Sequence, residues 1–164
     1  MAKLSSLNDL LIEELKDLYD AEHQITDALP KMAKAATNED LAAAFESHLA
    51  ETEEQVTRLE SIFETLEISP RGPKCKAMEG LLEEGKEVLE EDMEDDVRDA
   101  ALICSAQRVE HYEIAGYGCA RTFAARLGHD RVAKLLQQTL DEEAAADEKL
   151  THIAESQVNE EAVA

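Results

Sequence analysis

Apolar residues recur at alternating three- and four-residue steps along almost the whole chain, which is the period of amphipathic helices. No stretch alternates between apolar and polar residues as a half-buried strand would. The first helix is expected to begin after a cap at Ser5 or Ser6, and Pro30 is expected to bend or interrupt it. Its apolar positions are Leu4, Leu7, Leu11, Leu18, Ile25, Leu29 and Met32.

A second helix is expected to start at Thr37 or Asn38 and to end near residue 67. The following segment, residues 68–74, contains two prolines and a glycine and is interpreted as a loop. A short amphipathic helix comes next. Its apolar positions are Met78, Leu81, Leu82 and Leu89.

The second half of the chain repeats the arrangement of two long helices. One is expected from Asp95 to Leu127, with Gly128 as its C-cap. The last is expected to start at Asp130 and to fade after Gln157. The whole pattern predicts an all-α protein with a single domain over residues 1–164. Its architecture is a four-helix bundle whose long crossover carries a short extra helix.

An internal repeat indicates that this bundle consists of two similar hairpins. Residues 49–62 and 140–153 share leucine, glutamate, a basic residue and isoleucine at identical spacing. The first and third long helices share a Glu-His pair, Glu22-His23 and Glu110-His111. The first two long helices are therefore expected to match the last two.

Each of the four long helices carries acidic residues in the middle of its apolar face. A helix turns about 100° per residue, so the positions that share a face can be counted. On the third long helix the expected face consists of Ile103, Gln107, Glu110, Ile114, Tyr117 and Arg121, with His111 at its other edge. The candidate metal ligands on the four faces are Glu22, His48, Glu51, Glu110, Glu143 and Asp147.

Acidic residues in these positions need a positive partner. Burying an ionised carboxylate alone costs several kcal/mol, and a group of carboxylates also repels itself. Arg121 is the only cation expected on these faces, and it cannot neutralise them all. Two divalent metal ions could do so, as in dinuclear carboxylate bundles. Oxygen ligands with one or two imidazoles and no thiolate favour iron or manganese.

Each candidate also has a simpler interpretation. Glu22 or Glu51, taken singly, can face water at the edge of its helix, and His48 can be a core histidine with satisfied hydrogen bonds. The candidate residues are expected at a similar height along the bundle on all four helices, and this agreement favours the metal site. The spacing leaves open whether further residues ligate, namely Glu54, Glu113, His111 and Glu142.

The charge and cysteine content restrict the possible partners and compartment. A net charge of −22 argues against nucleic acids and anionic membranes, because both are bound through basic patches. This charge is compatible with cation binding or with a saline cytoplasm. Three cysteines without zinc-like spacing are typical of a reduced, cytoplasmic protein. The N-terminal segment is expected to be neither a signal peptide nor a membrane span.

Five segments, in order along the chain, closely resemble the YciE/YciF family of bacterial ferritin-like proteins. They are LYDAEHQITDALPKMAKAA, FESHLAETEEQVTRLE, KCKAMEGLLEEG, VEHYEIAGYGCARTFA and LLQQTLDEEAAADEKL, within residues 5–155. The resemblance implies a ferritin-like bundle, a dimer rather than a cage, and an association with stress responses. It also implies a dinuclear metal site on Glu22, Glu51, Glu110 and Glu143, with His48 and Asp147 as further candidates.

The chain departs from ferritins in its ligand spacing. Neither the second nor the last long helix contains Glu-x-x-His; they offer His48-x-x-Glu51 and Glu143-x-x-x-Asp147. No further helix is expected after residue 157, so a storage shell is not expected. Two functions follow. One is a dinuclear iron or manganese protein that oxidises Fe(II) or consumes peroxide. The other is a non-catalytic stress or interaction protein whose metal is structural or absent.

Two glycines lie inside the third long helix, Gly116 and Gly118. Each costs roughly 1 kcal/mol of helix stability relative to alanine. Close helix packing or a dimer contact is the expected reason for this cost. Together with the family resemblance, the glycines predict a homodimer.

Overall fold

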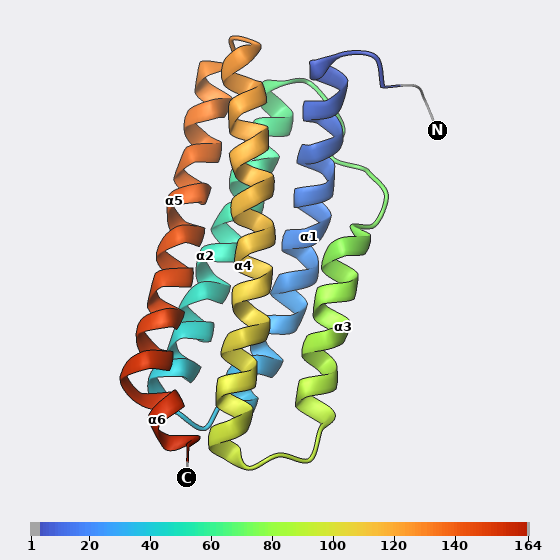
Figure 1. Cartoon of the computed structure of the whole chain (residues 1–164). Coiled ribbons are helices and arrows are strands. Elements are labelled where there is room, and N and C mark those ends of the chain that lie inside the picture. The colour runs from blue at the N-terminus through green and yellow to red at the C-terminus, as the bar shows by residue number, and fades with distance from the viewer. Residues whose placement is uncertain (1–3, 164) are drawn as a thin grey trace.

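The structure, a computed structural model that describes residues 4–163, consists of helices joined by loops (Figure 1). The helices are α1 (Leu7–Ala35), α2 (Glu39–Thr65), α3 (Lys76–Glu90), α4 (Asp95–Arg126) and α5 (Asp130–Ile153), followed by a π-helical turn (Ala154–Val158) and the single turn α6 (Asn159–Glu161). No helix within the described range combines the length and the apolar character needed to cross a membrane. Residues 4–163 contain no strand, which confirms the predicted all-α fold.

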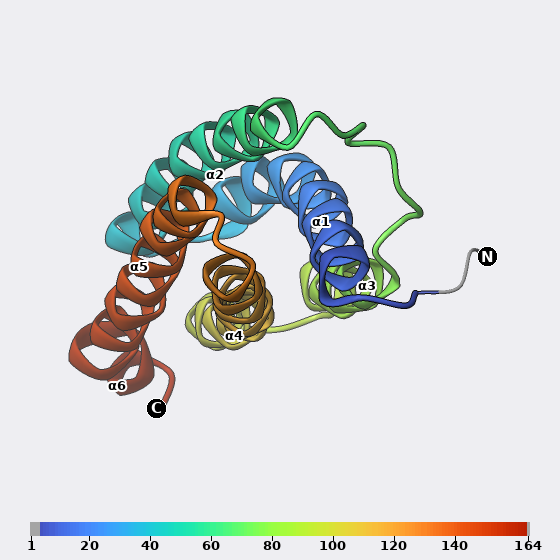
Figure 2. The same ribbon diagram turned by 90° about the horizontal axis from the view of Figure 1, so that it is seen from above.

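The four long helices form two antiparallel hairpins, α1 with α2 and α4 with α5 (Figure 2). The crossover after α2 carries α3, which packs outside the bundle against α1 and α4. It returns the chain to the end of the bundle where α2 began, so α2 and α4 run in the same direction (Figure 1). Contacts of α1 with α4 and of α2 with α5 join the hairpins. The bundle with a short helix on its long crossover is thus the predicted architecture.

Local sequence signals set the ends of the helices. Ser6 accepts a hydrogen bond from the backbone of Asp9, and the Asp9 side chain accepts one from the backbone of Ser6, which is a capping box. Asn38 caps α2 by accepting from the Leu41 backbone at 3.0 Å. Gly128 follows α4 with φ of 80°, a left-handed conformation that favours glycine. The predicted caps at Ser6, Asn38 and Gly128 are confirmed.

Pro30 does not interrupt the first helix, so that part of the prediction is wrong. α1 continues through Pro30 as far as Ala35. Proline removes a backbone hydrogen bond and costs roughly 3 kcal/mol in a helix interior. Leu29 and Met32, on either side of Pro30, are buried in the core while Pro30 itself is exposed. The burial of these neighbours offsets the loss of one hydrogen bond.

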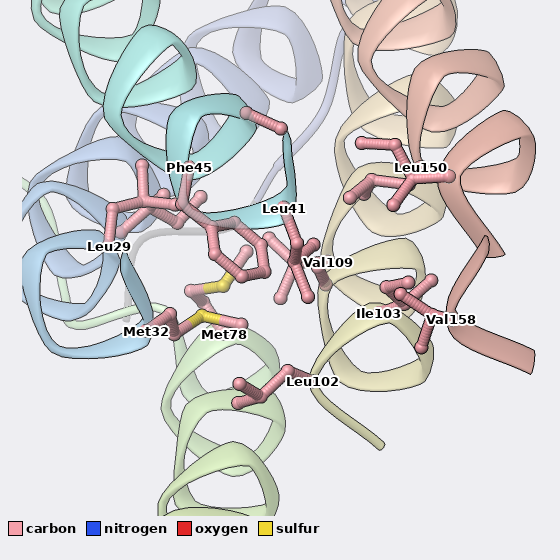
Figure 3. Close-up of a cluster of buried hydrophobic side chains, with 14 of the residues drawn as sticks. Leu29, Met32, Leu41, Phe45, Met78, Leu102, Ile103, Val109, Leu150 and Val158 are labelled. Carbon is pink, nitrogen blue, oxygen red and sulfur yellow. The ribbon is translucent and has the colours of Figure 1, made fainter. Parts of the chain in front are cut away.

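Apolar side chains form two separate buried clusters, one toward each end of the bundle. The first includes the residues labelled in Figure 3, which are Leu29, Met32, Leu41, Phe45, Met78, Leu102, Ile103, Val109, Leu150 and Val158. The second consists of Leu11, Leu15, Leu18, Leu59, Ile62, Phe63, Tyr117, Ala120, Ala124, Val132 and Leu136. Buried polar residues from all four long helices separate the two clusters.

The two glycines of α4 have different surroundings. A Cβ atom on Gly116 would lie 2.8 Å from Cδ2 of Leu18, a fully buried residue of α1. A Cβ atom on Gly118 would have no atom within 4 Å. Close helix packing, one of the two expected reasons, therefore applies to Gly116.

We predict that alanine has opposite effects at these two positions. Gly118→Ala should raise the free energy of unfolding by about 0.5–1 kcal/mol, because alanine favours the helix and meets no neighbour. Gly116→Ala should lower it by about 1–3 kcal/mol, because Leu18 must move within a packed core. Urea denaturation of both variants measures the difference. A stabilising Gly116→Ala would show that α1 and α4 do not approach as closely as described.

Candidate metal centre

Five buried residues with carboxylate or imidazole side chains meet between the two apolar clusters. We call Glu22, His48, Glu110, Glu113 and Glu143 the central cluster. They come from α1, α2, α4 and α5, and their exposed fractions lie between 0% and 6%. On α1, α2 and α5 each lies between apolar residues of its own helix, as Glu22 does between Leu18 and Ile25. The pattern that buries the leucines therefore buries these polar groups as well.

The distances within the central cluster are short. One ligand atom from each of His48, Glu110, Glu113 and Glu143 lies within 4.8 Å of the others. Nε2 of His48 is 3.3 Å from a Glu110 oxygen and 3.7 Å from a Glu143 oxygen. Glu22 completes the group from the side of α1, where it faces Glu113 and Glu143.

Burial and mutual repulsion shift the acidities of these carboxyl groups. Burial raises the pKa of Glu22 to about 8, and the charge of Glu143 adds to this shift. Burial also raises the pKa of Glu110 well above its usual range, with contributions from Glu143 and Glu22. The pKa of Glu113 rises for the same reasons. Without a bound cation, these groups therefore hold protons at a pH where surface glutamates have lost them.

Several oxygens of the central cluster make no hydrogen bond within the described part of the chain. They are Oε2 of Glu22, Oε2 of Glu110, both oxygens of Glu113 and Oε2 of Glu143. Buried polar atoms of folded proteins nearly always have partners, so such a concentration needs a physical cause. In the metal-free protein neighbouring carboxyl groups can share protons between these oxygens, and a cation could bind in place of those protons.

The nearest arginine does not neutralise the cluster. Arg58 of α2, rather than the expected Arg121, lies close enough to lower the pKa of Glu22. Its guanidinium already pairs with both oxygens of Glu142, at 2.7 and 2.9 Å, and donates to Thr139. Four carboxyl groups and one imidazole thus share a buried space without a cation of their own, and this donor set fits a divalent metal.

Neighbouring polar side chains fix the positions of two of the carboxyl groups. The hydroxyl of Tyr117, which is fully buried, donates a hydrogen bond to Glu22. The amide of Gln55 donates to Glu143 and, at 3.2 Å, to Glu142. Such outer hydrogen bonds orient the ligands of metal sites and are part of their design.

Two of the six predicted ligands lie outside the central cluster. The Glu51 side chain is 47% exposed, with one oxygen 3.6 Å from Nδ1 of His48. Asp147, 22% exposed, accepts a hydrogen bond from Gln107 and lies 3.2 Å from His111. The other four, Glu22, His48, Glu110 and Glu143, are brought together. Metal binding by Glu51 and Asp147 stays a prediction.

The residues left open by the spacing also differ in position. Glu113 belongs to the central cluster. Glu142 pairs with Arg58 instead. Glu54 is exposed, and the His111 side chain is 68% exposed.

Comparison with known proteins places the chain in a family. The family described as "Domain of unknown function (DUF892)" matches residues 6–163. The chain belongs to this family. Protein YciF of Escherichia coli (strain K12) is 48% identical over 160 residues, which are 97% of this chain and 96% of that protein. The resemblance to the YciE/YciF proteins is thereby confirmed.

Solved structures agree with the fold of this DUF892 protein. The crystal structure of the E. coli stress protein YciF has a TM-score of 0.92 and covers 95% of this chain and 99% of that one. "YcfI, a putative structural protein" from Rhodopseudomonas palustris has a TM-score of 0.88 at 46% identity and covers 91% and 95%. A Xanthomonas campestris protein with 21% identity and a TM-score of 0.74 shares the fold alone.

The apolar face expected on α4 of this DUF892 protein is wrong in part, and Glu113, which the spacing left open as a ligand, lies on the buried side. Ile114 was placed on the face, yet Glu113 is buried and Ile114 is half-buried. α4 contacts α1, α3 and α5, so its buried residues occupy more than one stripe. Glu110, Glu113 and Tyr117 follow one another at steps of three and four residues, and this spacing is the sequence signal that places Glu113 on the same face as Glu110.

We predict that the free energy of unfolding of the metal-free protein falls as pH rises from about 4.5 to about 8. Carboxyl groups of the unfolded chain ionise near 4.5, whereas folded Glu22 holds its proton to about 8. In this range the folded state binds more protons, so the free energy of unfolding decreases as pH increases. Denaturation of chelator-treated protein measures this, and Glu22→Gln should show a shallower slope. Equal slopes in the two proteins would contradict the shifted pKa of Glu22.

Proposed function

We propose that this chain binds two divalent metal ions, iron or manganese, in the central cluster. The observation that carries the proposal is the set of buried carboxyl oxygens that form no hydrogen bond in the described structure, while the guanidinium of Arg58 is already paired with Glu142. Ionised carboxyl groups that lie this close together repel one another, which is costly in a protein interior unless a cation offsets the repulsion. Divalent ions would both remove the repulsion and fill the unused ligand sites.

The donor chemistry favours iron or manganese. Four carboxyl groups and one imidazole are hard or intermediate ligands, which suit Fe(II) and Mn(II). The buried thiol, Cys75, hydrogen-bonds instead with Asp17 and Tyr112. His48, Glu110, Glu113 and Glu143 would hold the ions, with Glu22 as a further ligand from α1.

The surrounding residues would prepare the site. Tyr117 and Gln55 hold Glu22 and Glu143 in place, and apolar clusters pack on both sides of the central cluster. Bound iron supplies one-electron redox chemistry in such a setting. The protons that Glu110 and Glu113 hold in the metal-free protein would be released when a metal ion binds.

Fe(II) oxidation at the expense of peroxide fits this arrangement and a role in stress. Two Fe(II) ions would give up one electron each, and one hydrogen peroxide would take both electrons with two protons and become two water molecules. The E. coli relative is described as a stress protein, which supports this direction. The R. palustris relative is described as structural, and a bound ion that only stabilises the bundle is the second candidate.

We predict that Glu143→Gln changes stability in opposite directions with and without metal. In chelator, the substitution removes one negative charge and keeps an acceptor for Gln55, so it should stabilise by about 1 kcal/mol. In excess Mn(II) it should weaken binding tenfold or more, which removes at least about 1.4 kcal/mol of the stabilisation by metal. Melting curves under both conditions measure these effects.

Glu148→Gln is the matched control, because Glu148 is an exposed residue of the same helix. It should behave like wild type in both conditions. If Glu143→Gln gains as much from Mn(II) as wild type does, the central cluster is not the metal site. Loss of peroxide in the presence of Fe(II), faster in wild type than in Glu143→Gln, would distinguish the redox function from a structural ion.

A further inference from the structure

A cavity of about 110 Å³ connects the surface to the central cluster between α2 and α5. Its lining combines exposed residues with two buried members of the cluster. The outer residues are Ser47, Glu51, Ala145 and Lys149, and the inner ones are His48 and Glu110. The volume is sufficient for several water molecules, and therefore for an ion with part of its hydration shell.

Four residues of α5 line the cavity, and two of them are small. Ala145 and Ala146 lie beside Lys149 and the buried Leu150 in this wall. A larger side chain in place of either alanine would occupy the space in front of His48. The passage thus depends on the run of alanines that follows Glu143.

Ligand atoms line the passage from outside to inside. Glu51, half-exposed at the mouth, lies 3.6 Å from Nδ1 of His48. Nε2, the other ring nitrogen of His48, lies 3.3 Å from Glu110. A cation that enters would therefore meet a carboxylate, then an imidazole, then the buried carboxyl groups.

The position that the internal repeat makes equivalent, on the other side of the α2/α5 contact, is closed. The internal repeat matches Glu51 with Glu142 and Arg58 with Lys149. Arg58 and Glu142 form a two-pronged ion pair between α2 and α5. Lys149 is near enough to lower the pKa of Glu51, but in the described structure Glu51 contacts His48 and forms no ion pair with Lys149. One side of the α2/α5 contact is thus sealed and the other is open.

We propose that this cavity is the inlet through which divalent cations reach the central cluster, with Glu51 as the capturing ligand at its mouth. The inference rests on the proposed metal binding and adds the route and the direction of transfer. Glu51 attracts the cation and passes it to His48 and Glu110. Lys149 opposes the approach of a cation, so its charge limits the rate.

Stopped-flow absorbance with Co(II) as the probe tests the inlet. Ala146→Leu should slow both association and dissociation at least tenfold, because it narrows the passage. It should leave Kd within about threefold, because the residues that bind the ion are unchanged. Glu51→Gln should slow association several-fold, and Lys149→Gln should accelerate it. Ala144→Leu, at an exposed position outside the cavity on the same helix, should have wild-type rates.

The outcomes separate the inlet from the site itself. If Co(II) binds wild type but both Ala146→Leu and Glu51→Gln keep wild-type rates, the inlet is wrong and the metal site stands. If wild type binds no Co(II), the proposed function fails and the inlet fails with it. Should Ala146→Leu not fold, the opposite effects of Glu51→Gln and Lys149→Gln still decide the question.

Discussion

Repulsion among buried carboxyl groups is the constraint on which this bundle depends. Glu22 and Glu143 occupy positions that the apolar periodicity of their helices buries, and Glu110 and Glu113 lie on α4, which is buried on more than one side. Together these residues divide the core into two clusters. Proteins rarely accept such a layer without compensation, because each ionised group costs several kcal/mol to desolvate. Protons can compensate in the absence of metal, which the raised pKa values express. Divalent cations compensate better, since they also use the unpaired oxygens.

The same layer explains the polar contacts around it. Tyr117 and Gln55 are both buried, and each donates a hydrogen bond to a carboxyl group of the cluster. Arg58 pairs with Glu142 at the edge of the cluster and so fastens α2 to α5 without filling the centre. The two hairpins share a repeated sequence but differ at this contact, where one acid–base pair is closed and the other is open. This asymmetry gives the buried site a connection to the surface.

Helices α1 and α2 were predictable from sequence because each combines a periodic apolar face with a local cap, at Ser6 and at Asn38. Neither α4 nor α5 has a side-chain cap at its N-terminus, and the left-handed Gly128 marks the boundary between them. Glu22, His48, Glu110 and Glu143 were predictable because an acid or imidazole on an apolar stripe stands out against its leucines. Glu113 was not predictable in this way, because α4 packs against α1, α3 and α5 and its buried residues do not form a single apolar stripe. Arg58 and Pro30 depend on long-range contacts, a partner on α5 in one case and core packing in the other, which periodicity does not contain.

The most direct measurement is anomalous X-ray diffraction at the manganese edge from crystals grown with Mn(II). The central cluster should then contain anomalous density bonded to His48 and to oxygens of Glu110, Glu113 and Glu143. Two peaks, with Glu22 bound to one of them, would match the proposed dinuclear centre. Manganese bound only to surface carboxylates, with His48 and the buried glutamates in contact with one another, would contradict it.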